Sequence, residues 1–317
     1  FDAIVIYSNN STDLSDALLA CLSRHGVVEH HQHDPGTLSP QGQAAAMFLR
    51  SRRTKMGDWV LFVDADEFLN IKGGDHRIDH LIGLADGAQG VLLPWRMFGD
   101  AGHQRFQRRL ISSRYTCAAP IGHPKSLLVK SLTRVTPDLR FIGVHTPQLV
   151  PGFWSSGRVF LTPRMTPVDP SLAPYVRWVE LGGTPICNAS DVSYDHVQLN
   201  HYFTRAPAAF ELKFRRGSGG FGADLAEAGR VCYDRQNYSS QNFNSDEDSS
   251  ILGMQPATDA MQADLLNLPG VADIQTAIDA DYAAFETAFL AETSPSRGEA
   301  APPRTGLARW WRRRLRN

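Results

Sequence analysis

Three acidic residues within four positions are the part of this sequence best equipped for chemistry. Asp64, Asp66 and Glu67 follow an apolar run at 59–63, which is short and rich in β-favouring residues. The run predicts a strand of a sheet covered on both faces. Open α/β sheets bind ligands at the carboxyl ends of their strands. Carboxylates crowded in this way repel one another unless a cation or a shared proton stabilises them.

A divalent metal ion is the cation that this spacing favours. In an extended chain Asp64 and Asp66 lie on one face, and Ala65 between them is small. Oxygen ligands suit Mg²⁺ or Mn²⁺, which also binds phosphate oxygens. The pattern therefore predicts a metal site, with a solvated acidic loop as the alternative.

The elements around these acids alternate between strand and helix. Residues 3–7 predict a strand and 14–22 a helix, with a polar turn between them. Such a turn can hydrogen-bond a ribose or a base, and plain capping of the helix is the alternative. Its candidate nucleotide-binding residues are Asn9, Asn10 and Asp13.

Three further elements complete this half of the chain. We predict a helix at 40–56 with Ser39 as its N-cap, a helix at 78–85 and a strand at 91–98. The internal Pro94 indicates an edge strand or a distorted strand end. The order of elements is typical of a nucleotide-binding α/β half-domain. No G-x-x-x-x-G-K-[ST] or G-x-G-x-x-G motif occurs, so neither a P-loop nor a dinucleotide fold is supported.

Composition sets broader limits. The chain has 317 residues and 42% hydrophobic content, which suffices for one large domain or a domain with appendages. The net charge of -1 gives no attraction to nucleic acid, so we predict no nucleic-acid partner. The 4 cysteines lack C-x-x-C spacing, which argues against a zinc knuckle or a disulfide framework. No apolar run approaches the roughly 18 residues that cross a bilayer, and we predict a cytoplasmic protein.

Five stretches, spread in order over residues 4–217, share the pattern of one enzyme group. They are 6–13, 58–68, 95–99, 123–129 and the pair 197–203 with 211–217. The sequence resembles the bacterial family 2 glycosyltransferases related to glycosyltransferase family 92, which carry a D-x-D-E-F signature on a GT-A scaffold. The resemblance implies an α/β fold with a GT-A-type mixed sheet flanked by helices, in a domain at 1–217. It also implies that a strand and a helix precede Phe1.

The resemblance implies transfer of a hexose, with inversion, from a nucleotide sugar to a bacterial surface glycan or a lipid-linked acceptor. A UDP-linked donor is favoured. Asp64 and Asp66 would hold Mn²⁺ or Mg²⁺ against the donor diphosphate, because the departing diphosphate gains negative charge. His201, at the end of a predicted strand, would be the third ligand; a packed core histidine is the alternative.

Basic residues would bind the same diphosphate. Lys125 is one candidate, and Lys213 with Arg216, at i and i+3 on one helix face, forms a second. A solvated basic face is the alternative. An inverting transfer also needs a carboxylate that takes the proton of the acceptor hydroxyl. Glu67 and Asp100 are the open candidates, although the resemblance leads us to expect a small residue at Asp100.

The remainder of the chain predicts helices and a tail. We expect a helical C-terminal extension at 218–292, with two helices broken at Pro269–Gly270, and a solvated acidic cap at 246–248. Residues 293–317 predict a linker and a basic tail with paired tryptophans. Such a tail suits adsorption to an anionic membrane surface, here the inner face, and a disordered basic tail is the alternative.

Two other functions remain open at this point. A phosphohydrolase of the haloacid dehalogenase type also places two aspartates at a strand end, but it expects a small hydroxyl residue where Glu67–Leu69 stands. A non-catalytic carbohydrate-binding module would explain exposed aromatic residues but not acids after an apolar strand.

Overall fold

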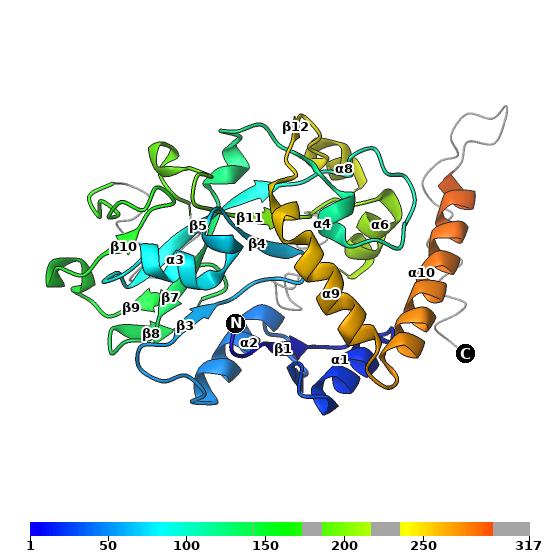
Figure 1. Ribbon diagram of the computed structural model, residues 1–317, viewed down its shortest axis with the longest axis horizontal. Coiled ribbons are helices and arrows are strands. Elements are labelled where there is room, and N and C mark those ends of the chain that lie inside the picture. Colours follow the sequence, from blue (N-terminus) through cyan, green and yellow to red (C-terminus); the bar gives the residue numbers. More distant parts are fainter. Residues whose placement is uncertain (142, 173–185, 217–234, 294–317) are drawn as a thin grey trace.

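A six-stranded mixed sheet forms the centre of the molecule (Figure 1). The computed structural model describes residues 1–141, 143–172, 186–216 and 235–293. The strand order is β3-β7-β5-β11-β4, and β10 pairs with the start of β5. The pairs β5–β10 and β5–β11 are parallel, and the other three are antiparallel. The strands are β3 (Trp59–Leu61), β4 (Glu67–Ile71), β5 (Gly90–Met97), β7 (Val129–Arg134), β10 (Phe160–Leu161) and β11 (Val197–His201). The predicted mixed α/β class is confirmed.

One face of the sheet changes from apolar to polar along its strands. Helix α3 (Ile78–Leu84) covers the apolar part, where its fully buried Leu81 belongs to a core cluster with Leu93 and Leu199. The register places Trp95 beside Leu199, Glu67 beside His201 and Lys130 beside Leu93. Because alternate residues of paired strands share a face, the side chains of Trp95, His201, Glu67 and Lys130 project from the same face of the sheet as Leu93 and Leu199. They lie near the carboxyl ends of β5 and β11.

The opposite face carries a buried arginine. Arg96 is 4% exposed, and its Nη2 lies 3.2 Å from Asp246 Oδ2 and its Nε 3.5 Å from Asp248 Oδ2. The expected solvated cap at 246–248 is therefore wrong, because a buried guanidinium requires carboxylate partners. This segment contains β12 (Asp246–Glu247), which pairs with β6 (Cys117–Ala118).

Two smaller parallel strands stand apart from the central sheet. β1 (Val5–Ser8) and β2 (Glu29–Gln32) pair only with each other among the described strands, and α1 (Ser15–Arg24) connects them. Ser39 caps α2 (Pro40–Arg50) as predicted, since its Oγ accepts the Gly42 N–H at 3.3 Å. The helix ends at Arg50, six residues before the expected end at residue 56. The remaining elements are α4 (Ile111–Arg114), β8 (Leu139–Phe141), β9 (Gln148–Leu149), α6 (Pro207–Arg216), α8 (Arg235–Gln241) and the short 3-10 helices Gly74–His76, Pro124–Leu127, Phe153–Ser156, Ala189–Asp191 and Ser250–Met254.

The two predicted C-terminal helices are present. They are α9 (Gln255–Leu266) and α10 (Val271–Thr293), and the break falls at 269–270. Helix α10 packs against α1 and α6, on the side of the molecule opposite β8 and β9 (Figure 1). His25, the C-cap residue of α1, hydrogen-bonds the Pro269 carbonyl at 3.1 Å. The predicted basic tail and residues 218–234 lie outside the described residues. Within the described part of the chain, no helix is both long and apolar enough to cross a bilayer.

Two predictions about strands were wrong. The apolar run at 59–63 forms only the three-residue β3, which is half-buried and pairs with β7 alone among the described strands, and Val63 beyond it is 42% exposed. Conversely, β5 is central although it contains Pro94. Pairing with β10 ends at Val91 and pairing with β11 begins at Trp95, so Pro94 occupies the gap where no backbone N–H is needed.

Gly90 provides a test of the packing within this sheet. A Cβ at Gly90 would lie 2.3 Å from the Phe160 ring and 2.8 Å from the Leu132 carbonyl oxygen. We expect Gly90→Ala to lower the free energy of unfolding by about 2 kcal/mol, because the buried ring must move. Urea unfolding measures the change. Gly83→Ala is the matched control, since a Cβ there meets nothing within 4 Å. Equal midpoints for the two variants would contradict the packing described.

Candidate functional site

The acidic residues form a tight turn between β3 and β4. The Glu67 N–H donates to the Asp64 carbonyl oxygen at 3.0 Å, so residues 64–67 reverse the chain. We call these four residues the acidic turn. The expectation that Asp64 and Asp66 share one face of an extended strand is wrong, because the strand ends at Leu61. The two carboxylates consequently have different neighbours.

Asp64 and Glu67 face a completely buried lysine. Lys130, the second residue of β7, is 0% exposed, and its Nζ lies 3.4 Å from Asp64 Oδ2 and 3.2 Å from Glu67 Oε2. The other Asp64 oxygen accepts from Gln41 Nε2 of α2 at 2.5 Å. Burial raises the pKa of Glu67 to about 7, although the positive charge of Lys130 opposes that rise. Each Asp64 oxygen is thus held by a side chain from a different element.

Asp66 faces a different lysine and a histidine. Its Oδ2 lies 2.5 Å from Lys213 Nζ of α6, and its Oδ1 lies 3.8 Å from His201 Nε2. Burial opposes ionisation of Asp66, but the positive charge around it holds its pKa below the usual range. Burial also lowers the pKa of His201 to about 3, so its imidazole is neutral at neutral pH. The arrangement is an ionised carboxylate beside a neutral imidazole.

The two predicted phosphate-binding lysines meet at one aromatic ring. The Nζ of Lys213 lies 4.1 Å from the Phe203 ring centroid, and that of Lys125 lies 5.4 Å from it. Cations near an aromatic face are attracted by its quadrupole. Lys125 also donates to Gln241 of α8. Arg216 is exposed at the last residue of α6, so the predicted basic pair on this helix is divided between interior and surface.

Buried polar atoms without a partner surround the same place. The Trp95 ring lies 4.3 Å from the His201 ring and 5.4 Å from the His145 ring, between centroids. Burial lowers the pKa of His145 to about 4, so this imidazole is also neutral. Among the described residues, Trp95 Nε1, His201 Nδ1 and Glu67 Oε1 have no hydrogen-bond partner. Such atoms are normally satisfied by water or a ligand.

Asp100 lies in a network of its own. It is 3% exposed, and its carboxylate accepts from Tyr238 at 2.6 Å, Asn242 at 2.8 Å, Asn244 at 2.9 Å and the Gly102 N–H at 2.8 Å. Although burial opposes ionisation, these donors keep the pKa of Asp100 below its usual range. The geometry gives Asp100 a structural role, and its predicted role as a base has no accessible oxygen to support it.

The predicted nucleotide turn lies at the carboxyl ends of β1 and β2. Asp13 accepts the Ser15 N–H at 2.9 Å, but the N-cap of α1 is Leu14, which makes no side-chain capping hydrogen bond. Asn10, with a positive φ of 48°, follows the half-buried Asn9 and contributes to an open pocket of about 310 Å³. The pocket is lined by Asn10, Ser11, Asp16, Gln32, His33 and Asp34. His33 bonds the carbonyl of Pro40, the neighbour of Gln41, which connects this pocket to Asp64.

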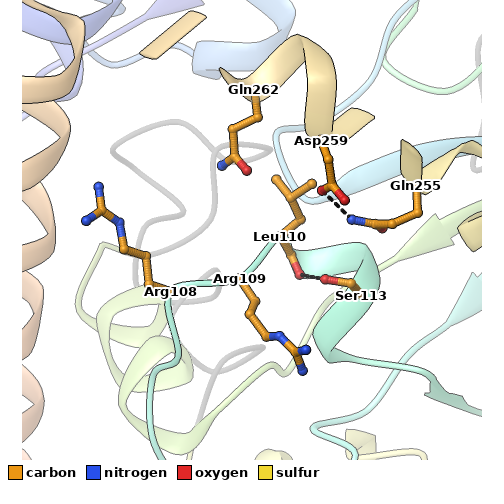
Figure 2. Close-up of a pocket in the computed structure, with 7 residues that line it drawn as sticks. All are labelled: Arg108, Arg109, Leu110, Ser113, Gln255, Asp259 and Gln262. Carbon is orange, nitrogen blue, oxygen red and sulfur yellow. Dashed lines mark hydrogen bonds between the residues drawn. The ribbon is translucent and has the colours of Figure 1, made fainter. Parts of the chain in front are cut away.

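A second open pocket, of about 320 Å³, contains none of the predicted site residues. It lies between α9 and the loop before α4 (Figure 2). Figure 2 shows the guanidinium groups of Arg108 and Arg109 pointing away from each other, and Arg108 pairs with Asp279 at 3.1 Å. Its basic residues do not converge on one position, so we assign it no ligand.

The donor set for a metal ion is smaller than predicted. Within the described ranges no group of three or more His, Cys, Asp or Glu side chains is arranged to hold a metal ion. Two of the three predicted ligands, Asp66 and His201, are neighbours, whereas Asp64 faces Gln41 and Lys130. A carboxylate and a neutral imidazole still fit Mn²⁺ or Mg²⁺ that takes its other ligands from phosphate and water.

Four residues of the site escaped the sequence analysis: Gln41, Trp95, Lys130 and Phe203. Only Lys130 gave a usable signal, because it is a lysine inside the apolar run at 127–132. A charge at such a position requires a buried partner. The other three depend on the packing of elements that are distant in sequence.

The fold and site together define a mixed α/β protein. Its buried cluster of Asp66, His201 and Lys213 lies near the carboxyl ends of the central strands β5 and β11. No family model, curated protein or solved structure matches the chain.

Proposed function

We propose that this protein is a GT-A-type glycosyltransferase that transfers a hexose from a nucleotide sugar, with Mn²⁺ or Mg²⁺ as its cofactor. The observation that carries the proposal is the placement of His201, Lys213 and Lys125 around Phe203, with Asp66 beside His201 and Lys213. An ionised carboxylate, a neutral imidazole and two ammonium groups are the set that a metal-bound diphosphate needs. The set lies near the carboxyl ends of two parallel strands, where α/β sheets bind ligands.

Each group has a distinct task in this proposal. Asp66 Oδ1 and His201 Nε2 would hold the divalent ion, whose chemistry is to stabilise the charge that develops on the departing diphosphate. Lys213 keeps Asp66 ionised through its contact with the other carboxylate oxygen. Lys125 would neutralise a phosphate oxygen. Its ammonium group lies near the Phe203 ring, as that of Lys213 does, but comes from the 3-10 helix Pro124–Leu127. These charges act more strongly in a site from which water is excluded.

The two candidate bases receive other roles. Glu67 is fully buried and binds Lys130 and the Asp64 N–H, and Asp100 is enclosed by four donors. In this proposal Glu67 therefore positions the acidic turn, and Asp100 positions the loop after β5. The acceptor class, a bacterial surface glycan or lipid-linked saccharide, and contact with the inner face of the membrane through the basic tail belong to the same proposal.

Nucleoside diphosphate release tests the proposed function. The protein is incubated with Mn²⁺ and a panel of nucleotide sugars, with UDP-hexoses first. We expect release with at least one donor, and a fall to background when EDTA removes the metal ion. Three results would overturn the proposal: no release from any donor, release of inorganic phosphate from phosphomonoesters, or glycan binding without donor turnover. The second would favour a phosphohydrolase and the third a carbohydrate-binding module.

A further inference from the structure

Lys130 is the most deeply buried charged residue at the site. Its side chain is 0% exposed, and its Nζ also lies 5.8 Å from the centroid of the Phe62 ring. An ammonium group in such surroundings is costly unless carboxylates compensate it. The compensation comes from Asp64 and Glu67, at 3.4 and 3.2 Å.

These contacts join β7 to both ends of the acidic turn. Glu67 Oε2, which faces Lys130, also accepts the Asp64 N–H at 3.0 Å. The Glu67 N–H returns to the Asp64 carbonyl oxygen. Gln41 holds the remaining oxygen of Asp64. The turn is therefore closed on itself by Glu67 and fixed to the sheet by Lys130.

We infer that Lys130 is a positioning residue of the proposed active site: it fixes the acidic turn and occupies the cation position between Asp64 and Glu67. Asp66, which projects from the same turn towards His201, is then the carboxylate left for an exchangeable divalent ion. Asp66 is placed by the turn and not by its own contacts alone. This inference rests on the proposed function for its catalytic consequence, but the geometry of the turn is independent of it.

The test compares Glu67→Gln with the double variant Glu67→Gln/Lys130→Met. Lys130→Met alone would leave the buried carboxylate of Glu67 and the partly exposed carboxylate of Asp64 without a cation and is expected to unfold. The double variant removes the buried Lys130–Glu67 pair together. We expect kcat for donor release to fall by at least about 10-fold in the double variant relative to Glu67→Gln, with a much smaller change in KM. Lys72→Met is the control, because Lys72 is a partly buried lysine beside Ser250, away from the acidic turn. It should keep the wild-type kcat.

Hydrogen exchange supplies a readout that needs no turnover. In the double variant we expect the amides of residues 62–68 to exchange at least about 10-fold faster than in Glu67→Gln, while the amides of β5 keep their protection. Unchanged exchange in the turn would overturn the inference, and so would a folded double variant with undiminished kcat. If the wild-type protein releases no nucleoside diphosphate, the proposed function fails, and the exchange result still decides whether Lys130 fixes the turn.

Discussion

Asp66→Asn is expected to lower the rate of nucleoside diphosphate release by about 1,000-fold, which corresponds to about 4 kcal/mol of transition-state stabilisation. The substitution keeps the shape of the side chain but removes the negative charge. It thereby removes the ionic ligand beside His201 and the carboxylate that meets Lys213 at 2.5 Å. Steady-state release with saturating Mn²⁺ measures the loss, and a higher Mn²⁺ requirement should accompany it.

Asp248→Asn is the matched control for this substitution. Asp248 is 13% exposed against 14% for Asp66, and it also faces a buried cation, Arg96, at 3.5 Å. It lies on the opposite face of the sheet, so its substitution should change the rate by less than about 3-fold under conditions in which both variants are folded. If Asp66→Asn retained more than about a tenth of the wild-type rate, Asp66 would not be a metal ligand.

Short sequence signals correctly predicted the elements whose positions depend on interactions between residues close together in the chain. Ser39 caps α2, apolar spacing located α3, and Pro269–Gly270 separates α9 from α10. Each depends on interactions within a few residues, such as capping or the absence of a proline N–H. The same holds for β11, whose final residue was expected to be His201.

Strand environment was not predictable, because it depends on pairing partners. An apolar run suggested that β3 is covered on both faces, yet it lies at one end of the described sheet order. Pro94 suggested an edge, yet β5 is central, since its partner changes from β10 to β11 around the proline. No property of either run alone distinguishes these outcomes.

The sequence predicted the acidic members of the site and the lysines Lys125 and Lys213, but not Lys130 or the way in which the charges pair. Asp66, His201 and Lys213 were expected near one another, and the structure brings them together. The contact between Asp64 and Lys130 depends on the register of β7 against β3 and β5, and that register cannot be predicted from the sequence. The side chains that donate to Asp100 are 138 to 144 residues away in the chain.

Asp100→Ala is expected to lower the free energy of unfolding by about 3 kcal/mol, because it leaves several buried donors without an acceptor. Tyr238, Asn242 and Asn244 all direct donors at this carboxylate, and the Asn242 and Asn244 side-chain oxygens accept the N–H groups of Asp100 and Ala101 in return. The loop after β5 would therefore keep the two backbone bonds to Asn242 and Asn244 but lose the side-chain bonds to the segment before β12. Urea unfolding at neutral pH measures the change.

The pH dependence of that loss tests its cause. The pKa of Asp100 is lower in the folded protein than its usual value, because hydrogen-bond donors stabilise the ionised form despite burial. Its stabilising contribution is therefore complete above the unfolded pKa of about 3.9 and is lost as the pH falls through the folded pKa. The difference between wild type and Asp100→Ala should narrow below about pH 4. Asp79→Ala, at a side chain that is 72% exposed in a surface ion pair, should change stability by less than about 1 kcal/mol at neutral pH. A loss in Asp100→Ala no larger than in this control would show that the network does not hold the loop, and would return Asp100 to consideration as a base.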